Sequence, residues 1–519
     1  MSQERVIVGI DLGTAYSALA MVDAFGKPEV LPNAAGERTT PSVIYFEPDA
    51  PPLVGRAAKD MRASDPSRVV EFIKREMGNP NFIFLPDPGG DEEDTYLPHE
   101  LSALILQKLK KDAEQILGKR ITDAVITVPA YFRDAQRSAT LMAGKLAGLN
   151  VIEIINEPTA AALAYGFNRR ESRERILVYD LGGGTFDVTL LEISPDDFRV
   201  LASDGDSSLG GKDFDDRLIN HFYKVFEAKH GMDLSDDLDM IGELRDRAER
   251  TKVKLSSLNT VRERITYRGK SVDVEIPRAT FEDLTADLLG RTEDLVQYTL
   301  SQAGLTWSDL DHVLLVGGST RMPMVPALLE RISGKSPART INPDEAVAMG
   351  AALRGWLLSS EISEDVQVSL PPPPSIRVRD AAPHSLGVVT IDRNGRDRNT
   401  ILLPKNCEIP ASFSRAFSTA ADNQTHVAIK VTQGEDEDLD YCSIVGEFLL
   451  GPIPPLPRGA SQIRVAISYD KNGAVKISAS DENSGKAVVT EIAGSELIIS
   501  ADELARRAGR IAGLSRSDG

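Results

Sequence analysis

Three glycine-containing turns are the residues of this chain best suited to chemistry. They lie at Asp11–Thr14, Asp180–Thr185 and Gly317–Thr320, and each follows a short apolar run typical of a buried strand. A glycine turn lets backbone N–H groups approach a ligand with no Cβ in the way, which a polyphosphate requires. An aspartate at the end of the strand suits a hydrated divalent cation. The repeated pattern therefore indicates a polyphosphate site rather than ordinary turns.

The elements around these turns repeat as well. Residues 4–357 alternate strand-like and helix-like segments, which predicts α/β architecture. Each Asp-Leu-Gly turn is followed by a second strand, at Tyr16–Val22 and Phe186–Ile193, so we expect an internal duplication whose halves face each other across a nucleotide cleft. The predicted helices include Pro98–Leu117, Arg133–Ala147, Asp213–His230, Leu238–Leu255, Thr280–Ala303 and Pro323–Ile332.

The character of the sequence changes after residue 360. Glu361–Ser375 begins acidic and then carries Pro371–Pro374, which favours a stiff polyproline II spacer without sheet or helix pairing. Residues 376–499 show short alternating runs separated by turn signals, as in an antiparallel β-sandwich, and Ser500–Leu514 is helix-like. We expect domains at 1–360 and 381–499, a linker at 361–380 and a short helix within 500–519.

Composition excludes several classes of protein. A net charge of −19 over 519 residues argues against nucleic acid as the main partner. The two cysteines, Cys407 and Cys442, cannot form a disulfide framework, and no Cys/His cluster has metal-ligand spacing. No signal-peptide pattern or membrane-spanning apolar run occurs, so we expect no membrane association and a cytoplasmic location.

A series of segments, in order along most of the chain, resembles the heat shock protein 70 (DnaK-type) chaperone family. These segments are Gly9–Thr14, Glu37–Ser42, Ile73–Arg75, Ile126–Phe132, Ile154–Ala162, Asp180–Asp187, Leu209–Asp215, Val316–Pro323, Asn342–Val347 and Phe417–Gln424. The resemblance implies an actin-like (duplicated, ribonuclease H-like) ATPase domain, a linker, a peptide-gripping sandwich and a helical lid. It implies ATP or ADP with Mg²⁺ as cofactors and leaves K⁺ open. The implied partners are unfolded or extended peptides, with a J-domain cochaperone and a nucleotide-exchange factor left open.

The resemblance also assigns catalytic roles. Asp11 and Asp180 would hold Mg²⁺ through water and orient the attacking water. The other candidates, near the γ-phosphate, are Lys74, Glu157, Thr185 and Asp187. From the residues alone, Lys74 is equally a solvated charge, Glu157 a carboxylate at the start of a helix, and Asp187 a plain strand residue.

Further positions are implied to contact the nucleotide. They are Gly13, Thr14, Ala15, Tyr16, Gly182, Gly183, Gly184, Gly210, Gly211, Glu249, Lys252, Ser256, Gly317, Gly318, Ser319, Arg321 and Asp344. The adenosine set of Glu249, Lys252 and Ser256 has spacings of three and four, which place it on one helix face, although a charged amphipathic helix has the same pattern. Gly334–Ser336 mimics the end of a P-loop, but Leu329 stands where that motif needs glycine, so we interpret it as a helix-ending turn.

The peptide site is implied by apolar positions in the predicted sandwich. They are Val388, Ile391, Phe417, Ala420, Val427, Ile429 and Val431. An extended peptide can be held by backbone hydrogen bonds together with a pocket for one side chain. The alternating Val427, Ile429 and Val431 fit a sandwich core equally well.

The chain departs from the family at several places. Only Ser500–Leu514 could form part of the lid, and a groove without a lid should release peptide quickly. Arg377 and Arg379 occur in the linker, which is leucine-rich in the family, while Leu141 and Glu153 replace residues that are usually basic. These reciprocal charge changes suggest an ion pair between Glu153 and the linker arginines.

The sequence favours an ATP-driven chaperone in which hydrolysis controls the affinity for hydrophobic peptide segments. An alternative is a divergent paralogue whose nucleotide is mainly a structural ligand and whose peptide binding is decoupled from hydrolysis. A small-molecule kinase of the actin-like fold and an actin-like filament protein are less favoured, because a sandwich follows the α/β region.

Overall fold

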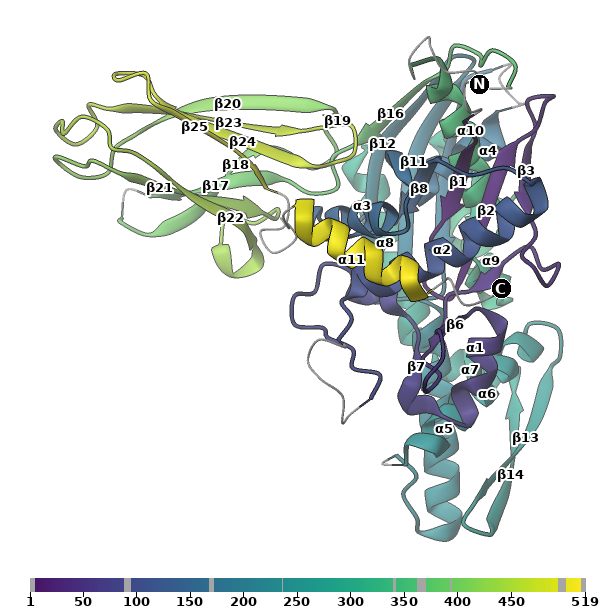
Figure 1. Ribbon diagram of the computed structural model, residues 1–519. Helices are drawn as coiled ribbons and strands as arrows, with labels where there is room; N and C mark the ends of the chain where they lie inside the picture. The colour runs from purple at the N-terminus through teal and green to yellow at the C-terminus, as the bar shows by residue number, and fades with distance from the viewer. Residues whose placement is uncertain are drawn as a thin grey trace.

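The computed structural model describes residues 5–87, 95–167, 172–235, 237–338, 342–361, 370–392, 394–492 and 501–514. An α/β region, up to residue 361, carries a sandwich that projects from one side, and the C-terminal helix returns to lie against the α/β region (Figure 1). The predicted combination of an α/β fold, a β-sandwich and a short C-terminal helix agrees with this architecture.

Two similar sheets form the centre of the α/β region. The first has the order β3-β2-β1-β8-β9 and the second contains β12-β11-β10-β15. In each sheet the strand that leads into an Asp-Leu-Gly turn is antiparallel to the next strand in sequence and parallel to a later one, β8 or β15. The internal duplication expected from sequence is therefore present in the topology. The strands are β1 (Ile7–Asp11), β2 (Tyr16–Val22), β3 (Pro28–Leu31), β8 (Asp123–Val128), β9 (Asn150–Asn156), β10 (Glu174–Leu181), β11 (Phe186–Ser194), β12 (Asp197–Asp206) and β15 (His312–Val316).

Two helices of small apolar residues, α4 (Glu157–Gly166) and α10 (Ala346–Leu358), are buried in the core cluster that both sheets share. They pack so closely that a Cβ on Gly350 would lie 1.7 Å from the carbonyl oxygen of Ala160. A Cβ on Gly9 of β1 would lie 2.0 Å from the backbone nitrogen of Ala352. Glycine at these two positions allows the sheets to approach each other through a thin helical layer.

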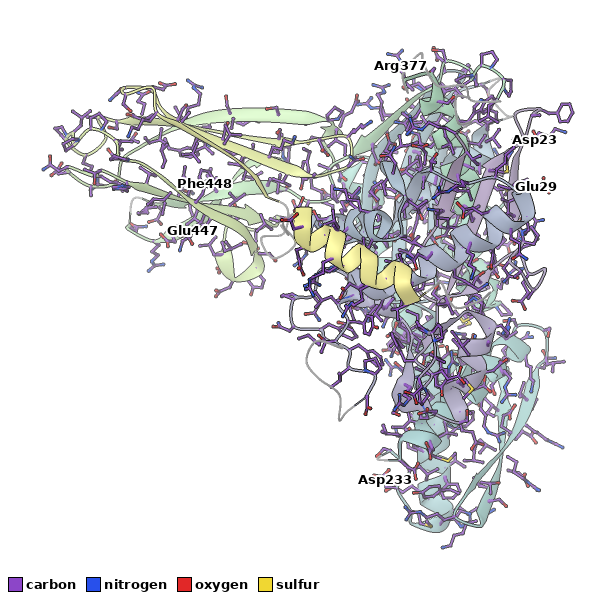
Figure 2. All side chains as sticks on the ribbon, viewed as in Figure 1. Asp23, Glu29, Asp233, Arg377, Glu447 and Phe448 are labelled. Carbon is purple, nitrogen blue, oxygen red and sulfur yellow. The ribbon has the colours of Figure 1, made fainter. Side chains whose placement is uncertain are left out.

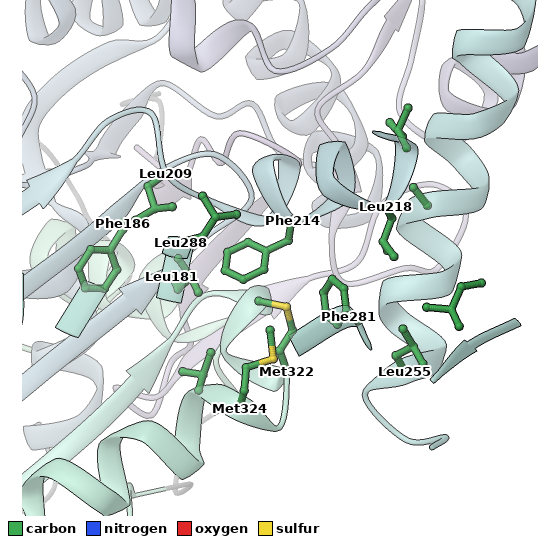
Figure 3. Close-up of a cluster of buried hydrophobic side chains, with 14 of the residues drawn as sticks. Leu181, Phe186, Leu209, Phe214, Leu218, Leu255, Phe281, Leu288, Met322 and Met324 are labelled. Carbon is green, nitrogen blue, oxygen red and sulfur yellow. The ribbon is translucent and has the colours of Figure 1, made fainter. Parts of the chain in front are cut away.

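The remaining α/β elements extend this centre. A second cluster, rich in Phe and Leu, joins β10 and β11 to the helices beyond the second sheet (Figure 3). The smaller strands are β4 (Thr40–Pro41), β5 (Ile44–Tyr45), β6 (Leu53–Val54), β7 (Val69–Val70), β13 (Thr260–Tyr267) and β14 (Lys270–Pro277). The helices are α1 (Arg56–Asp60), α2 (Pro98–Leu117), α3 (Asp134–Leu146), α5 (Gly211–His230), α6 (Leu238–Leu255), α7 (Arg278–Leu284), α8 (Ala286–Gln302) and α9 (Met324–Ser333).

The helix predictions hold with one correction. The single helix expected at 280–303 is wrong, because the chain breaks at Thr285, whose φ of −119° and ψ of 7° are not helical. The buried Thr285 hydroxyl donates to the carbonyl oxygen of Phe281 at 2.8 Å, which offers the backbone an alternative to continuing the helix. The helix-ending turn expected after Leu329 is confirmed, since α9 ends at Gly334 in the left-handed region at φ 68°.

The sandwich consists of two four-stranded antiparallel sheets, with orders β18-β17-β21-β22 and β20-β23-β24-β25. Buried aliphatic side chains from both sheets, such as Val431 and Ile467, form its core. The strands are β17 (Leu386–Ile391), β18 (Asp397–Leu403), β20 (Ala411–Ser418), β21 (Val427–Gln433), β22 (Ser443–Leu450), β23 (Gln462–Tyr469), β24 (Val475–Asp481) and β25 (Ala487–Ile492).

The linker between the α/β region and the sandwich contains a paired strand. Residues Arg377–Ala381 form a strand, β16, which pairs in parallel with β12 and antiparallel with the short β19 (Glu408–Ile409). The unpaired spacer is expected only up to Ser375, and Pro371–Pro374 has neither helix nor strand structure, in agreement with it. The prolines are anchored instead by the Trp356 indole, whose Nε1 donates to the Pro371 carbonyl oxygen at 2.8 Å.

The C-terminal helix α11 (Ala501–Leu514) packs on α2 and α3 of the α/β region. Its Ile511 is fully buried there, in the same cluster that the side chain of Leu141 packs against. Arg510 donates to Glu100 at 2.7 Å. An apolar residue at 141 thus fits this surface. The first residue of the predicted helix, Ser500, lies outside the described residues.

Among the described helices none is long and apolar enough to cross a bilayer. The cytoplasmic location expected from the sequence stays a prediction.

The close contact between α4 and α10 leads to a first prediction. Replacing Gly350 with alanine forces a methyl group into the Ala160 backbone, so we expect a loss of about 2–3 kcal/mol in the free energy of unfolding. The measurement is urea denaturation followed by circular dichroism. The control is Gly290→Ala in α8, where no atom lies within 4 Å of the new Cβ, and a gain of about 0.5–1 kcal/mol is expected there. Equal effects at the two sites would contradict the close-packing argument.

Candidate functional site

A cavity of about 390 Å³ lies between the two halves of the α/β region. Both Asp-Leu-Gly turns, the third turn at Gly317–Ser319 and helix α6 contribute to its lining. Every position that the sequence assigned to catalysis or nucleotide contact lines this cavity, except Gly184, Asp187 and Gly210. The structure therefore collects these residues from eight separate stretches of chain around one space.

The two Asp-Leu-Gly turns meet directly at the cavity wall. A Cβ on Gly183 would lie 2.6 Å from the Cβ of Ala15, and one on Gly184 would lie 2.4 Å from Cγ2 of Thr14. Gly210 supports them from behind, since its Cβ would lie 2.5 Å from the Gly184 nitrogen. The third turn needs glycine for conformation as well, because Gly317 has φ of 83°. Gly184 and Gly210 thus serve the site by close packing behind its lining.

The ammonium group of Lys74 lies among carboxylates of the cavity. Lys74 is buried and forms an ion pair with Glu157, the first residue of α4. Phe72, two residues before Lys74, has a left-handed φ of 60° and precedes a short helical turn, Ile73–Glu76, in which Lys74 is buried. Neither residue is a solvated surface charge, and Glu157 both starts a helix and faces the cavity.

The other carboxylates here are buried close to one another. Burial and the nearby Glu157 raise the pKa of Asp11 to about 7 and that of Asp187 to about 8. The pKa of Asp180 is also raised well above its ordinary value, by burial and by Glu157, Asp187 and Asp11. Asp187 stands opposite Asp180 in the β10–β11 register, and its Oδ1 accepts from the backbone N–H of Tyr131 at 3.1 Å. Asp187 is therefore a partnered carboxylate beside the cavity and does not line it.

This arrangement fits a nucleotide with a hydrated cation. The glycine turns present backbone to the cavity, and the buried carboxylates near Lys74 outnumber its ammonium, so added positive charge relieves their repulsion. In the part of the chain that the structure describes, no cluster of three or more His, Cys, Asp or Glu side chains is arranged to hold a metal directly. Asp11 and Asp180 both line the cavity, and their action on Mg²⁺ through water stays a prediction.

The cavity residues expected to contact adenosine are held by partners that the sequence did not predict. Glu249 bridges Lys59 at 2.6 Å and Arg62 at 3.1 Å, and although burial opposes it, these cations lower the pKa of Glu249 to about 2. Lys252 pairs with Asp215 at 2.7 Å. Lys59 and Arg62 lie nearly 190 positions before Glu249, and no local pattern signals such a contact.

A comparison with protein families agrees with this geometry. The family model for the Hsp70 protein matches residues 7–82 and 89–512. The chain belongs to the Hsp70 family. Members of this family are generally ATPases and chaperones that bind nucleotide with Mg²⁺, which is the chemistry that the cavity fits. The match extends beyond the ATPase region through the linker, the sandwich and most of α11.

The positions matched to the Hsp70 peptide pocket do not form one group. Val388, Ile429 and Val431 are buried in the sandwich core, and Val427 and Phe417 pack against it. Ile391 is 56% exposed at the end of β17, and Ala420 is exposed in the loop after β20. The core interpretation, left open by the sequence, therefore describes the buried members of this set.

The suggested ion pair between Glu153 and the linker is wrong. The carboxylate of Glu153 is buried, and it accepts two hydrogen bonds, of 2.6 and 2.8 Å, from the guanidinium of Arg354 in α10. Arg379 pairs instead with Asp197 of β12 and with Glu408 of β19, while Arg377 is exposed at the surface (Figure 2). The strand pairing of β16 decides this, because it turns Arg379 toward the start of β12. Glu153 is therefore a neutralised, buried charge.

The raised pKa of Asp187 leads to a prediction about pH. The folded protein keeps the Asp187 proton up to about pH 8, whereas the unfolded chain loses it near the ordinary value of 3.8. Between these values the folded state binds more protons, so the free energy of unfolding falls as the pH rises, by up to about 1.4 kcal/mol per pH unit for this group.

Asp187→Asn removes this pH-dependent contribution to the free energy of unfolding. In nucleotide-free buffer with a chelator, we expect the variant's thermal midpoint to rise relative to the unsubstituted protein as the pH increases from 5 to 8. Asp283→Asn, at an exposed position on α7, serves as the control. Parallel pH profiles for Asp187→Asn and the unsubstituted protein would exclude a raised pKa at this position.

Proposed function

We propose that this chain is an ATP-dependent molecular chaperone that binds extended hydrophobic segments of unfolded proteins, with ATP hydrolysis controlling its affinity for peptide. In this proposal residues 1–360 form the ATPase domain, 361–380 the linker, 381–499 the peptide-binding sandwich and 500–519 the short lid segment. Unfolded peptides are the main partners, and a J-domain cochaperone and a nucleotide-exchange factor are the regulatory partners that the family suggests.

The position of the linker strand is the single observation that carries the proposal. β16 lies in the same sheet as β10 and β11, the strands that carry Asp180 and Asp187, and it also pairs with β19 next to the sandwich. A shift of the second sheet on nucleotide binding would therefore displace the strand that leads into the sandwich. Packed sheets transmit such displacements because they deform little internally.

Further contacts join the sandwich to the first sheet and its helices. The Asn472 side chain accepts from the Ile154 N–H at 3.1 Å, and the Val475 N–H donates to Asp134 at 3.1 Å. Lys405 pairs with Asp204 of β12 at 2.8 Å with both side chains buried. The sandwich thus contacts both halves of the ATPase region, and it is placed to respond to a change in the angle between them.

The cavity residues would divide the work of hydrolysis. The glycine turns and Thr14 would bind the phosphates, and Glu249, Lys252 and Ser256 would hold the nucleoside. Bound Mg²⁺ would neutralise phosphate charge. Lys74 would stabilise negative charge on the γ-phosphate. Asp11, Glu157, Asp180, Thr185 and Asp187 would orient the attacking water and the hydrated cation.

Single-turnover ATP hydrolysis tests the assigned chemistry. Lys74→Met removes the ammonium that pairs with Glu157 while roughly keeping the volume of the side chain, so we expect a rate loss of about 10²–10³-fold, with ATP binding changed far less. Lys224→Ala, at an exposed position on α5, is the matched control and should hydrolyse at the unsubstituted rate. Full activity in Lys74→Met would remove Lys74 from the mechanism.

Adding an unfolded peptide to the same assay tests the coupling. A peptide that binds the sandwich and acts through β16 should accelerate single-turnover hydrolysis. Hydrolysis that is indifferent to a peptide that demonstrably binds would identify the decoupled paralogue, in which nucleotide is a structural ligand.

A further inference from the structure

A histidine of the sandwich side is buried against the ATPase region, close to the carboxylates of the cavity. His384 lies in the loop between β16 and β17, and only 4% of it is exposed. Its ring meets the ring of Tyr131 edge-on, with the two centroids 4.4 Å apart. Tyr131 lies in the segment between β8 and α3, and its ring also receives the ammonium of Lys405 at 5.1 Å. The two parts of the chain therefore enclose one aromatic pair.

The same histidine holds the backbone of Tyr131. His384 Nε2 lies 3.1 Å from the Tyr131 carbonyl oxygen, and since a carbonyl oxygen only accepts, Nε2 carries the proton. Burial lowers the pKa of His384 to about 3, so the ring is neutral near pH 7 and this tautomer is fixed by the contact. On its other side, the His384 carbonyl accepts from the Tyr469 hydroxyl at 3.1 Å, which ties it to β23 of the sandwich.

Tyr131 in turn holds Asp187. The Tyr131 N–H donates to Asp187 Oδ1 at 3.1 Å. Gly205 of β12 keeps this contact compact, since a Cβ there would lie 2.9 Å from that oxygen and 3.2 Å from the Tyr131 Cβ. A continuous path of residues therefore runs from Tyr469 through His384 and Tyr131 to the carboxylate beside the cavity.

We propose that His384 is a positioning residue for ATP hydrolysis, which fixes Tyr131 and thereby holds Asp187 beside the cavity, outside its lining, while the sandwich is packed against the ATPase region. The proposal rests on the ATPase function proposed above. When the sandwich moves away, His384 leaves with it, the Tyr131 backbone relaxes, and the Asp187 carboxylate is free to face the water that attacks the γ-phosphate. The contact thus acts as a brake on basal hydrolysis.

The kinetic test compares two substitutions at this position. His384→Leu removes the donor and keeps an apolar side chain, so basal single-turnover hydrolysis should rise about fivefold, the factor that one net hydrogen bond supplies, with the KM for ATP unchanged. Stimulation by an unfolded peptide should shrink correspondingly. His384→Gln keeps an N–H donor at similar reach and should restore the slow basal rate. Ser443→Ala removes another contact between the two parts, the 2.8 Å bond from Arg133, and should leave the rate unchanged.

Hydrogen exchange provides a readout that needs no hydrolysis. In the nucleotide-bound protein, the Tyr131 amide should exchange about tenfold faster in His384→Leu than in the unsubstituted chain, and His384→Gln should restore protection. If no protein hydrolyses ATP but this exchange pattern holds, the proposed function fails while the positioning contact stands. Unchanged exchange at Tyr131, or leucine and glutamine variants that behave alike in both assays, would overturn the role of His384.

Discussion

The close approach of two glycine turns is the constraint on which the rest of this structure depends. Gly183 and Gly184 of the second half lie against Ala15 and Thr14 of the first, where any added Cβ would overlap its neighbour. The layer between the sheets is packed just as closely, because a Cβ on Gly350 would overlap the backbone of Ala160. Because the two sheets come this close, the ends of β1 and β10 place their aspartates around a single cavity.

That geometry carries an electrostatic consequence. Asp11, Asp180 and Asp187 share a buried space with Glu157, and the pKa of each of the three aspartates is raised. The nearby cation, Lys74, is already paired with Glu157. A site with this charge pattern is stabilised by additional cations, which a nucleotide with hydrated Mg²⁺ brings. The repulsion among the carboxylates in the nucleotide-free protein therefore favours ligands that bring cations into the cavity.

The sandwich is connected to this charge cluster by two kinds of contact. The linker strand β16 extends the second sheet, and ion pairs of Arg379 secure it between β12 and β19. His384, only a few residues further on, reaches the Tyr131 backbone. In a family whose linker is leucine-rich, a linker held by a guanidinium–carboxylate network makes packing of the two parts more dependent on charge and less on apolar burial.

The sequence by itself determined the α/β fold, the duplicated turns and the sandwich, and nearly all of the positions that it assigned to the nucleotide site line the cavity. It could do so because glycine turns after apolar strands and alternating runs are local patterns with direct physical meaning. It missed the break at Thr285, where a side-chain hydroxyl overrides the local helix preference, and it did not predict the pairing of β16 with β12. Only the tertiary structure decided that Glu153 belongs to Arg354, that Lys59 and Arg62 meet Glu249, and that His384 faces Tyr131. These are contacts between side chains far apart in the chain, and their partners are set by how the sheets and the sandwich pack, which no local pattern encodes.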